Sequence, residues 1–152
     1  MKIPPDWRTI EPASSDDLTP APISPDWILA GTPRARSKVI ETSRDRTMSI
    51  MTWECTAGRF NWHYNQDEMV IVVSGEVFIT NDKGEERRLG QGDIAFFPAG
   101  SSCTWRVTDH IKKIAVLRKD LPSPLGFGVL AWHLLLRIIG KRGQSPLAPA
   151  HP

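Results

Sequence analysis

The chain has 152 residues, of which 40% are hydrophobic and 24% are charged. This length fits one domain with tails, and the apolar fraction is large enough to form a core, which excludes an intrinsically disordered chain. The 19 basic and 17 acidic residues give a net charge of +2, and since they form no dense basic stripe, a nucleic-acid-binding protein is not expected.

Cysteine content and the start of the chain bear on the compartment. The two cysteines, Cys55 and Cys103, are too few for the disulfide framework of a small secreted domain, although a bond between these two stays open. Residues 1–12 are polar and contain proline, without the apolar run of a signal peptide. We therefore expect a cytoplasmic protein.

The first segment, residues 1–37, is rich in proline and holds seven of the 13 prolines in the chain. Proline fixes φ and removes a backbone donor, so long regular structure is not expected here. The segment is predicted to be an extended arm that lies on a partner surface through aromatic anchors such as Trp7 and Trp27. A loose tail is the alternative for residues 1–20.

Residues 38–120 form the predicted folded body, in which short β-rich runs alternate with turn residues. Many short strands at regular spacing are typical of a β-sandwich or barrel. The expected strands are Met48–Cys55, Phe60–Tyr64, Glu68–Ser74, Glu76–Thr80, Glu86–Leu89, Asp93–Phe97, Cys103–Val107 and Lys112–Leu117. Gly75 is expected to make a tight hairpin between the third and fourth of these strands.

The last segment, residues 121–152, is predicted to contain a helix over residues 125–139, which follows two prolines and ends at Gly140. A helix of this length spans roughly 22 Å, less than the ~30 Å hydrocarbon core of a bilayer, so no membrane span is expected. Packing on the barrel or on a second subunit is the preferred interpretation. Attachment to a membrane surface is the alternative.

Two blocks of sequence carry a specific spacing. The first contains His63, Glu68 and Gly75, with six residues between the last two. The second contains, in chain order, Gly92, Pro98, Gly100 and Cys103. These blocks resemble the two motifs of the cupin superfamily. In the first motif, two histidines one residue apart precede a glutamate and a glycine; in the second, Gly and Pro-x-Gly precede a third histidine.

A closer resemblance is to the small cupins grouped with (S)-ureidoglycine aminohydrolase. It rests on four stretches: Thr52-Trp53-Glu54-Cys55, Phe60-Asn61-Trp62-His63-Tyr64, Gly92 to Gly100, and Trp105-Arg106-Val107. The resemblance implies an all-β, jelly-roll barrel of the RmlC-like cupin type, with an extended N-terminal arm and one C-terminal helix. It also implies a homodimer and, as one possible activity, an enzyme on a small nitrogenous metabolite.

Strand alternation predicts which side chains meet inside the barrel. After Gly100, Cys103 shares the apolar, inward face with Trp105. On the earlier strand, Trp62 and Tyr64 stand at the two histidine positions if three residues separate the second position from Glu68. If four residues separate them, Asn61 and His63 stand there instead. Burial preference favours the first register.

The preferred register gives a pocket with few metal ligands. Glu68 and Cys103 are the candidate catalytic groups, and Trp62, Tyr64 and Trp105 are the candidate ligand-binding residues. No cofactor is expected, since a divalent ion needs three or four well-placed ligands. In the other register, His63, Glu68 and Cys103 would form a metal site. Glu68 could also serve a structural role by hydrogen bonding to Tyr64 or to backbone groups, and Cys103 could be an inert core residue.

These features allow three functions. The first is a module that binds a small organic molecule in an aromatic-lined pocket. The second is an aminohydrolase-like enzyme, which the fold alone supports only weakly. The third is a non-catalytic dimeric scaffold.

Overall fold

The computed structural model describes residues 16–138 and divides the chain into two units, residues 1–120 and 121–152. The second unit contains helix α1 (Ser123–Ile138), close to the range predicted. The first unit contains the 3-10 turn η1 (Pro25–Trp27) and eight strands, listed here: β1 (Thr19–Pro20), β2 (Ile28–Ala30), β3 (Ala35–Thr42), β4 (Met48–His63), β5 (Asp67–Thr80), β6 (Glu86–Gly90), β7 (Ile94–Phe97) and β8 (Ser102–Arg118).

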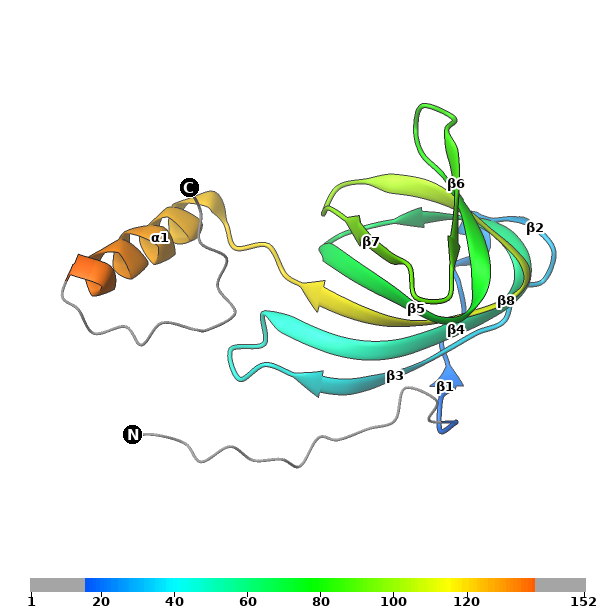
Figure 1. Cartoon of the computed structure of the whole chain (residues 1–152), viewed down its shortest axis with the longest axis horizontal. Helices are drawn as coiled ribbons and strands as arrows, with labels where there is room; N and C mark the ends of the chain where they lie inside the picture. Colours follow the sequence, from blue (N-terminus) through cyan, green and yellow to red (C-terminus); the bar gives the residue numbers. More distant parts are fainter. Residues whose placement is uncertain (1–15, 139–152) are drawn as a thin grey trace. The chain divides into compact units, whose positions relative to one another are not determined.

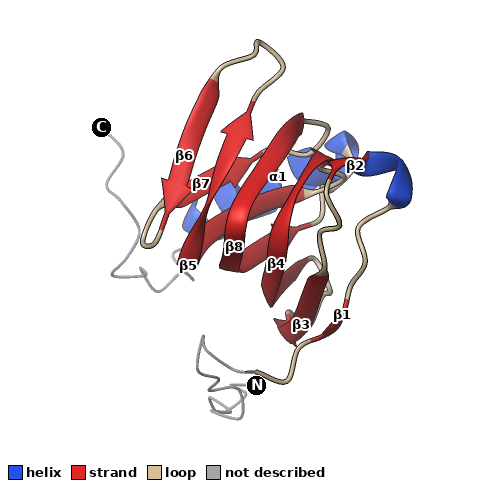
Figure 2. Cartoon of the chain, turned by 90° about the vertical axis from the view of Figure 1, so that its right-hand side faces the viewer, coloured by secondary structure: helices blue, strands red, loops and turns tan. Residues whose placement is uncertain are grey.

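The strands form one antiparallel sheet that curls into a barrel (Figure 1). Its order is β1-β3-β4-β8-β5-β6, with β2 added to β4 and β7 added to β5. Figure 2 shows β5, β8, β4 and β3 side by side in this order. The all-β barrel with one C-terminal helix is the predicted fold class.

Three strands are longer than predicted, because six of the expected strands join in pairs. Gly75 does not make a hairpin; it lies inside β5, where the register against β8 shifts. The positive φ of Gly75, +74°, bends the strand without reversing it. A Cβ at this position would lie 2.1 Å from the carbonyl oxygen of His110, so the close approach of β8 also requires glycine.

The described part of the predicted arm is extended, but it pairs with the barrel of its own chain. β1 pairs with β3, β3 pairs with β4, and β2 pairs with the far end of β4. The prediction did not name β3, which begins at Ala35. The first 15 residues and the expected tail, with Trp7 and Gly140, lie outside the described residues.

The barrel core is aromatic at its centre. Phe60 and Trp105 are almost fully buried and their rings stack at 6.2 Å, while Trp53 meets both rings edge-on. Aliphatic side chains of β5, including Val70 and Val72, close the core on the other side. Buried aromatic and aliphatic side chains together supply the apolar area that stabilises the barrel.

Candidate functional site

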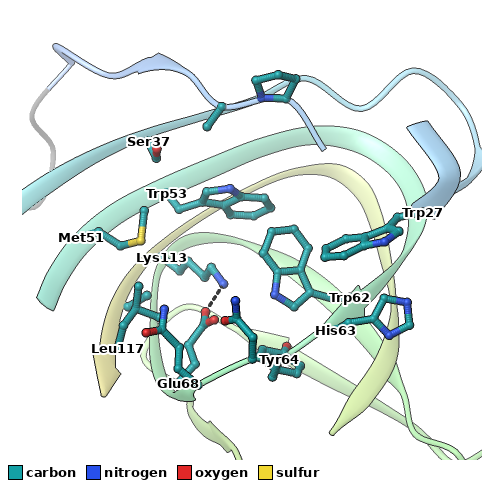
Figure 3. Close-up of a pocket in the computed structure, with 15 residues that line it drawn as sticks. Trp27, Ser37, Met51, Trp53, Trp62, His63, Tyr64, Glu68, Lys113 and Leu117 are labelled. Carbon is teal, nitrogen blue, oxygen red and sulfur yellow. Dashed lines mark hydrogen bonds and ion pairs between the residues drawn. The ribbon is translucent and has the colours of Figure 1, made fainter. Parts of the chain in front are cut away.

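A cavity of about 400 Å³ opens on the barrel beside this core (Figure 3). Most of its wall is apolar, and its polar groups come from β3, β4, β5, β8 and the segment between β4 and β5. The lining residues are Ala21, Pro22, Trp27, Ser37, Met51, Trp53, Trp62, His63, Tyr64, Asn65, Gln66, Glu68, Lys113, Ala115 and Leu117. A concave apolar site with a few convergent polar groups is typical of small-molecule binding.

The end of β4 has the preferred register of the two that the sequence allowed. Phe60 and Tyr64 are buried, Trp62 packs against the core, and His63 on the opposite face is exposed. Alternation along a strand therefore places Trp62 and Tyr64 toward the interior. Both line the cavity, as does Glu68 at the start of β5.

A buried ion pair forms the polar centre of the cavity wall. Lys113 Nζ of β8 donates a hydrogen bond to Glu68 Oε1 of β5 at 2.6 Å, and their side chains are only 3% and 8% exposed. Figure 3 shows the two side chains meeting at the cavity. Glu68 thus has Lys113 as its partner, and not Tyr64 as the structural interpretation of the sequence suggested.

Three indole rings surround the ammonium group of Lys113. Its Nζ lies 4.5 Å from the ring centroid of Trp105, 4.9 Å from that of Trp53 and 5.6 Å from that of Trp62. The negative face of an aromatic ring attracts a cation, and more strongly where water is excluded. Glu68 and the indoles together stabilise a charged lysine inside the barrel.

Lys113 is a residue of this candidate site that the sequence-based prediction did not name. A signal for it was present, because alternation places Lys113 on the same face as Ile111 and Ala115, which are both buried. A lysine on an apolar strand face needs a buried partner. Glu68, the carboxylate already predicted in the pocket, is that partner.

Behind the cavity wall, Tyr64 connects two of the other predicted site residues. Trp105 Nε1 donates to the Tyr64 hydroxyl at 3.1 Å, and that hydroxyl lies 3.6 Å from Cys103 Sγ. The Tyr64 ring also stacks on Phe97 at 4.6 Å. Neither Trp105 nor Cys103 lines the cavity itself.

Burial sets the acid–base behaviour of this group. Desolvation raises the pKa of the Cys103 thiol above its ordinary value, although the hydrogen bond with Tyr64 opposes the shift. Desolvation likewise raises the pKa of the Tyr64 hydroxyl. A protonated thiol is a weak nucleophile, and Cys103 packs, partly buried, against the core. Cys103 and Cys55 are both free thiols.

The alternative metal site of His63, Glu68 and Cys103 is not formed. His63 lies at the cavity rim, where Nδ1 hydrogen-bonds Ser102 Oγ at 2.7 Å and its ring meets Trp27 at 5.0 Å. Among residues 16–138, no group of three or more His, Cys, Asp or Glu side chains could hold a metal ion. The residues around Glu68 do not fit a divalent ion, since Lys113 already places a cation there.

The N-terminal segment completes the cavity. Trp27 of η1 meets the Trp62 ring edge-on at 5.6 Å, and Ala21 and Pro22 also line the cavity. Pro25 at the start of η1 favours the tight turn that carries Trp27. This tryptophan was predicted as an anchor for a partner surface, whereas it contacts the cavity of its own chain.

Comparison with known proteins agrees with the fold. Residues 42–115 match the family model of the EutQ-like cupin domain. A solved protein of unknown function from Pseudomonas syringae is 24% identical with a TM-score of 0.61, over 66% of this chain and 43% of its own length. A putative ethanolamine utilization protein Q from Salmonella typhimurium is 24% identical with a TM-score of 0.51, over 56% of this chain and 69% of its own.

Identities at this level show the fold alone. The chain spans 43% of the Pseudomonas protein, less than half of its length. No curated protein matches the chain. The jelly-roll barrel, the matched family model and the two motif blocks nevertheless agree with one another. The chain therefore has the fold of a jelly-roll cupin, and its residues 42–115 match the EutQ-like cupin domain.

Proposed function

We propose that the barrel binds a small organic molecule that has a compact apolar body and a neutral polar end. The observation that carries this proposal is the Glu68–Lys113 ion pair at the wall of the cavity of about 400 Å³. Their hydrogen bond uses one ammonium donor and one carboxylate oxygen, so capacity for a ligand remains on both groups.

The balance of charge selects the polar end. A charged ligand group would leave a net charge among the aromatic side chains, which is costly where water is excluded. An amide carries a donor for Glu68 and an acceptor for Lys113 within one neutral group. The apolar body would lie against Trp53 and Trp62, which line the same cavity.

A catalytic role is the alternative that the resemblance to the (S)-ureidoglycine aminohydrolase group raises. It would assign chemistry to Glu68 and Cys103 together. Only Glu68 lines the cavity, and the pKa of the Cys103 thiol is raised by burial. These two observations favour a binding module over an enzyme that needs both groups.

Benzamide, benzoate and benzylamine test the proposal, because they share one ring and differ in the charge of the polar end. We expect benzamide to give the largest increase in melting temperature and the tightest binding by calorimetry. Glu68→Gln should weaken the binding of benzamide roughly 10- to 100-fold, which corresponds to the loss of a hydrogen bond to a charged group. The affinity for benzoate should rise relative to that for benzamide.

Glu76→Gln is the matched control, since Glu76 forms its ion pair with Arg88 at the barrel surface, away from the cavity. This variant should bind all three probes as the wild type does. The proposal is wrong if benzoate or benzylamine binds tighter than benzamide, or if the two glutamine variants behave alike.

A further inference from the structure

Helix α1 exposes large apolar side chains on most sides of its axis. At about 100° per residue, Leu130 lies about 140° around the helix from Leu125, Phe127 about 200° and Leu135 about 280°. All four side chains are exposed, Phe127 by as much as 71% and Leu130 by 67%. A helix that buries a single stripe against a protein does not have this pattern.

The width of the apolar surface limits what could cover it. A flat protein surface on the side of Leu125 would leave Leu130 and Phe127 in water, and a surface on their side would leave Leu125 in water. Contiguous apolar patches of this kind mark interaction sites for proteins or membranes. An apolar medium that surrounds most of the helix circumference fits better than one packed face.

The charge of this segment is also unlike the rest of the chain. Residues 121–152 contain three of the 19 basic residues and none of the 17 acidic ones. The basic residues are Arg137, Lys141 and Arg142, so the positive charge lies in the last part of this segment of the sequence. Anionic lipid head groups attract such a basic segment.

A second copy of the chain is a poorer partner for this helix. Two such helices packed together would bring basic residues close to one another, and residues 121–152 contain no acidic residue to pair with them. The length of α1 limits how it could meet a membrane. The 16 residues of the helix span about 24 Å, and no helix among residues 16–138 is long and apolar enough to cross a membrane.

We propose that α1 attaches the chain to the surface of an anionic lipid bilayer. The apolar side chains, which occupy most of the helix circumference, enter the boundary between head groups and acyl chains, and the narrow polar side at His133 faces the head groups. This attachment is independent of what the barrel cavity binds.

Co-sedimentation of the full chain with vesicles tests the proposal. We expect binding to vesicles of phosphatidylcholine with phosphatidylglycerol, and much weaker binding to phosphatidylcholine alone. Replacing Arg137, Lys141 and Arg142 by alanine should weaken binding to the anionic vesicles roughly a hundredfold, at about 1 kcal/mol for each charge. Leu134→Glu should abolish binding, because it places a charge on the apolar surface.

Phe96→Glu is the matched control, since Phe96 on β7 is 62% exposed and Leu134 on α1 is 59% exposed. This variant should bind vesicles as the wild type does. Equal binding of both variants, or no binding to anionic vesicles, would overturn the proposal. So would a large fall in barrel stability with Leu134→Glu, which would show that α1 packs on the barrel. A smaller oligomer for Leu134→Glu than for the wild type would show that α1 joins chains, and would overturn the proposal too.

Discussion

Removal of Lys113 should destabilise the barrel strongly, because the buried carboxyl group of Glu68 would lose its partner. The Lys113 and Glu68 side chains are 3% and 8% exposed, and their atoms Nζ and Oε1 lie 2.6 Å apart. Breaking a buried ion pair by removing one partner costs about 3–5 kcal/mol. Lys113→Met keeps most of the apolar stem, so nearly all of this loss would come from the charge.

A double variant distinguishes the interaction between Glu68 and Lys113 from the packing of their side chains. Glu68→Gln combined with Lys113→Met leaves no buried charge, and a buried pair replaced on both sides is often close to neutral. We therefore expect the double variant to be more stable than Lys113→Met alone, with a coupling energy of about 1–3 kcal/mol. Urea unfolding followed by circular dichroism measures these free energies of unfolding.

An ion pair on the barrel surface provides the control. Arg88 Nε and Glu76 Oε2 also lie 2.6 Å apart, but their side chains are 59% and 34% exposed. Arg88→Met should cost only about 0.2–1 kcal/mol, as solvent-exposed pairs do. If Lys113→Met costs no more than Arg88→Met, or if the effects of the two cavity substitutions simply add, the reasoning about a coupled buried pair is refuted.

Three further outcomes follow from the core and from the turns. Phe60→Ala should lower the free energy of unfolding by about 3–5 kcal/mol, since the side chain is fully buried; a loss below 1 kcal/mol would contradict its central place. Burial raises the pKa of Cys55 from 9.0 to about 12, so the unfolded chain ionises first and stability should fall as the pH rises from 9 toward 12. Urea titrations at several pH values measure this, and an increase in stability over that range would oppose the assignment. Gly75→Ala should lower the free energy of unfolding by more than about 1 kcal/mol, and by more than Gly84→Ala does. Both glycines have a positive φ, but only at Gly75 would a Cβ collide with backbone atoms of β8. Equal losses for the two variants would show that the close approach of β8 is unimportant.

Local patterns in the sequence were enough to predict the architecture and one face of the site. The alternation of Phe60, Trp62 and Tyr64 placed these residues inside the barrel, and their burial agrees with this. The turn at Gly92 and the end of β7 at Pro98 were also predicted correctly. Such features depend on neighbours along one strand or turn, which a sequence displays directly.

The length of β5 was harder to predict, because a glycine with positive φ occurs both in hairpin turns and in bent, continuous strands. Glycine at Gly75 could close a hairpin or bend a continuous strand, and local sequence favours neither. The tertiary structure decides the matter, since β8 approaches so closely at His110 that only a bent strand without a Cβ fits.

The polar centre of the site is also a tertiary result. Glu68 and Lys113 are 45 residues apart in the chain, and β5 and β8 bring them to one hydrogen bond. Alternation could place each residue on the inner face of its own strand, but it could not show that the two strands align them. The composition and pattern of the chain thus determined a barrel with an aromatic interior, while the register between strands decided which charges meet there, because an ion pair depends on distances that sequence spacing does not contain.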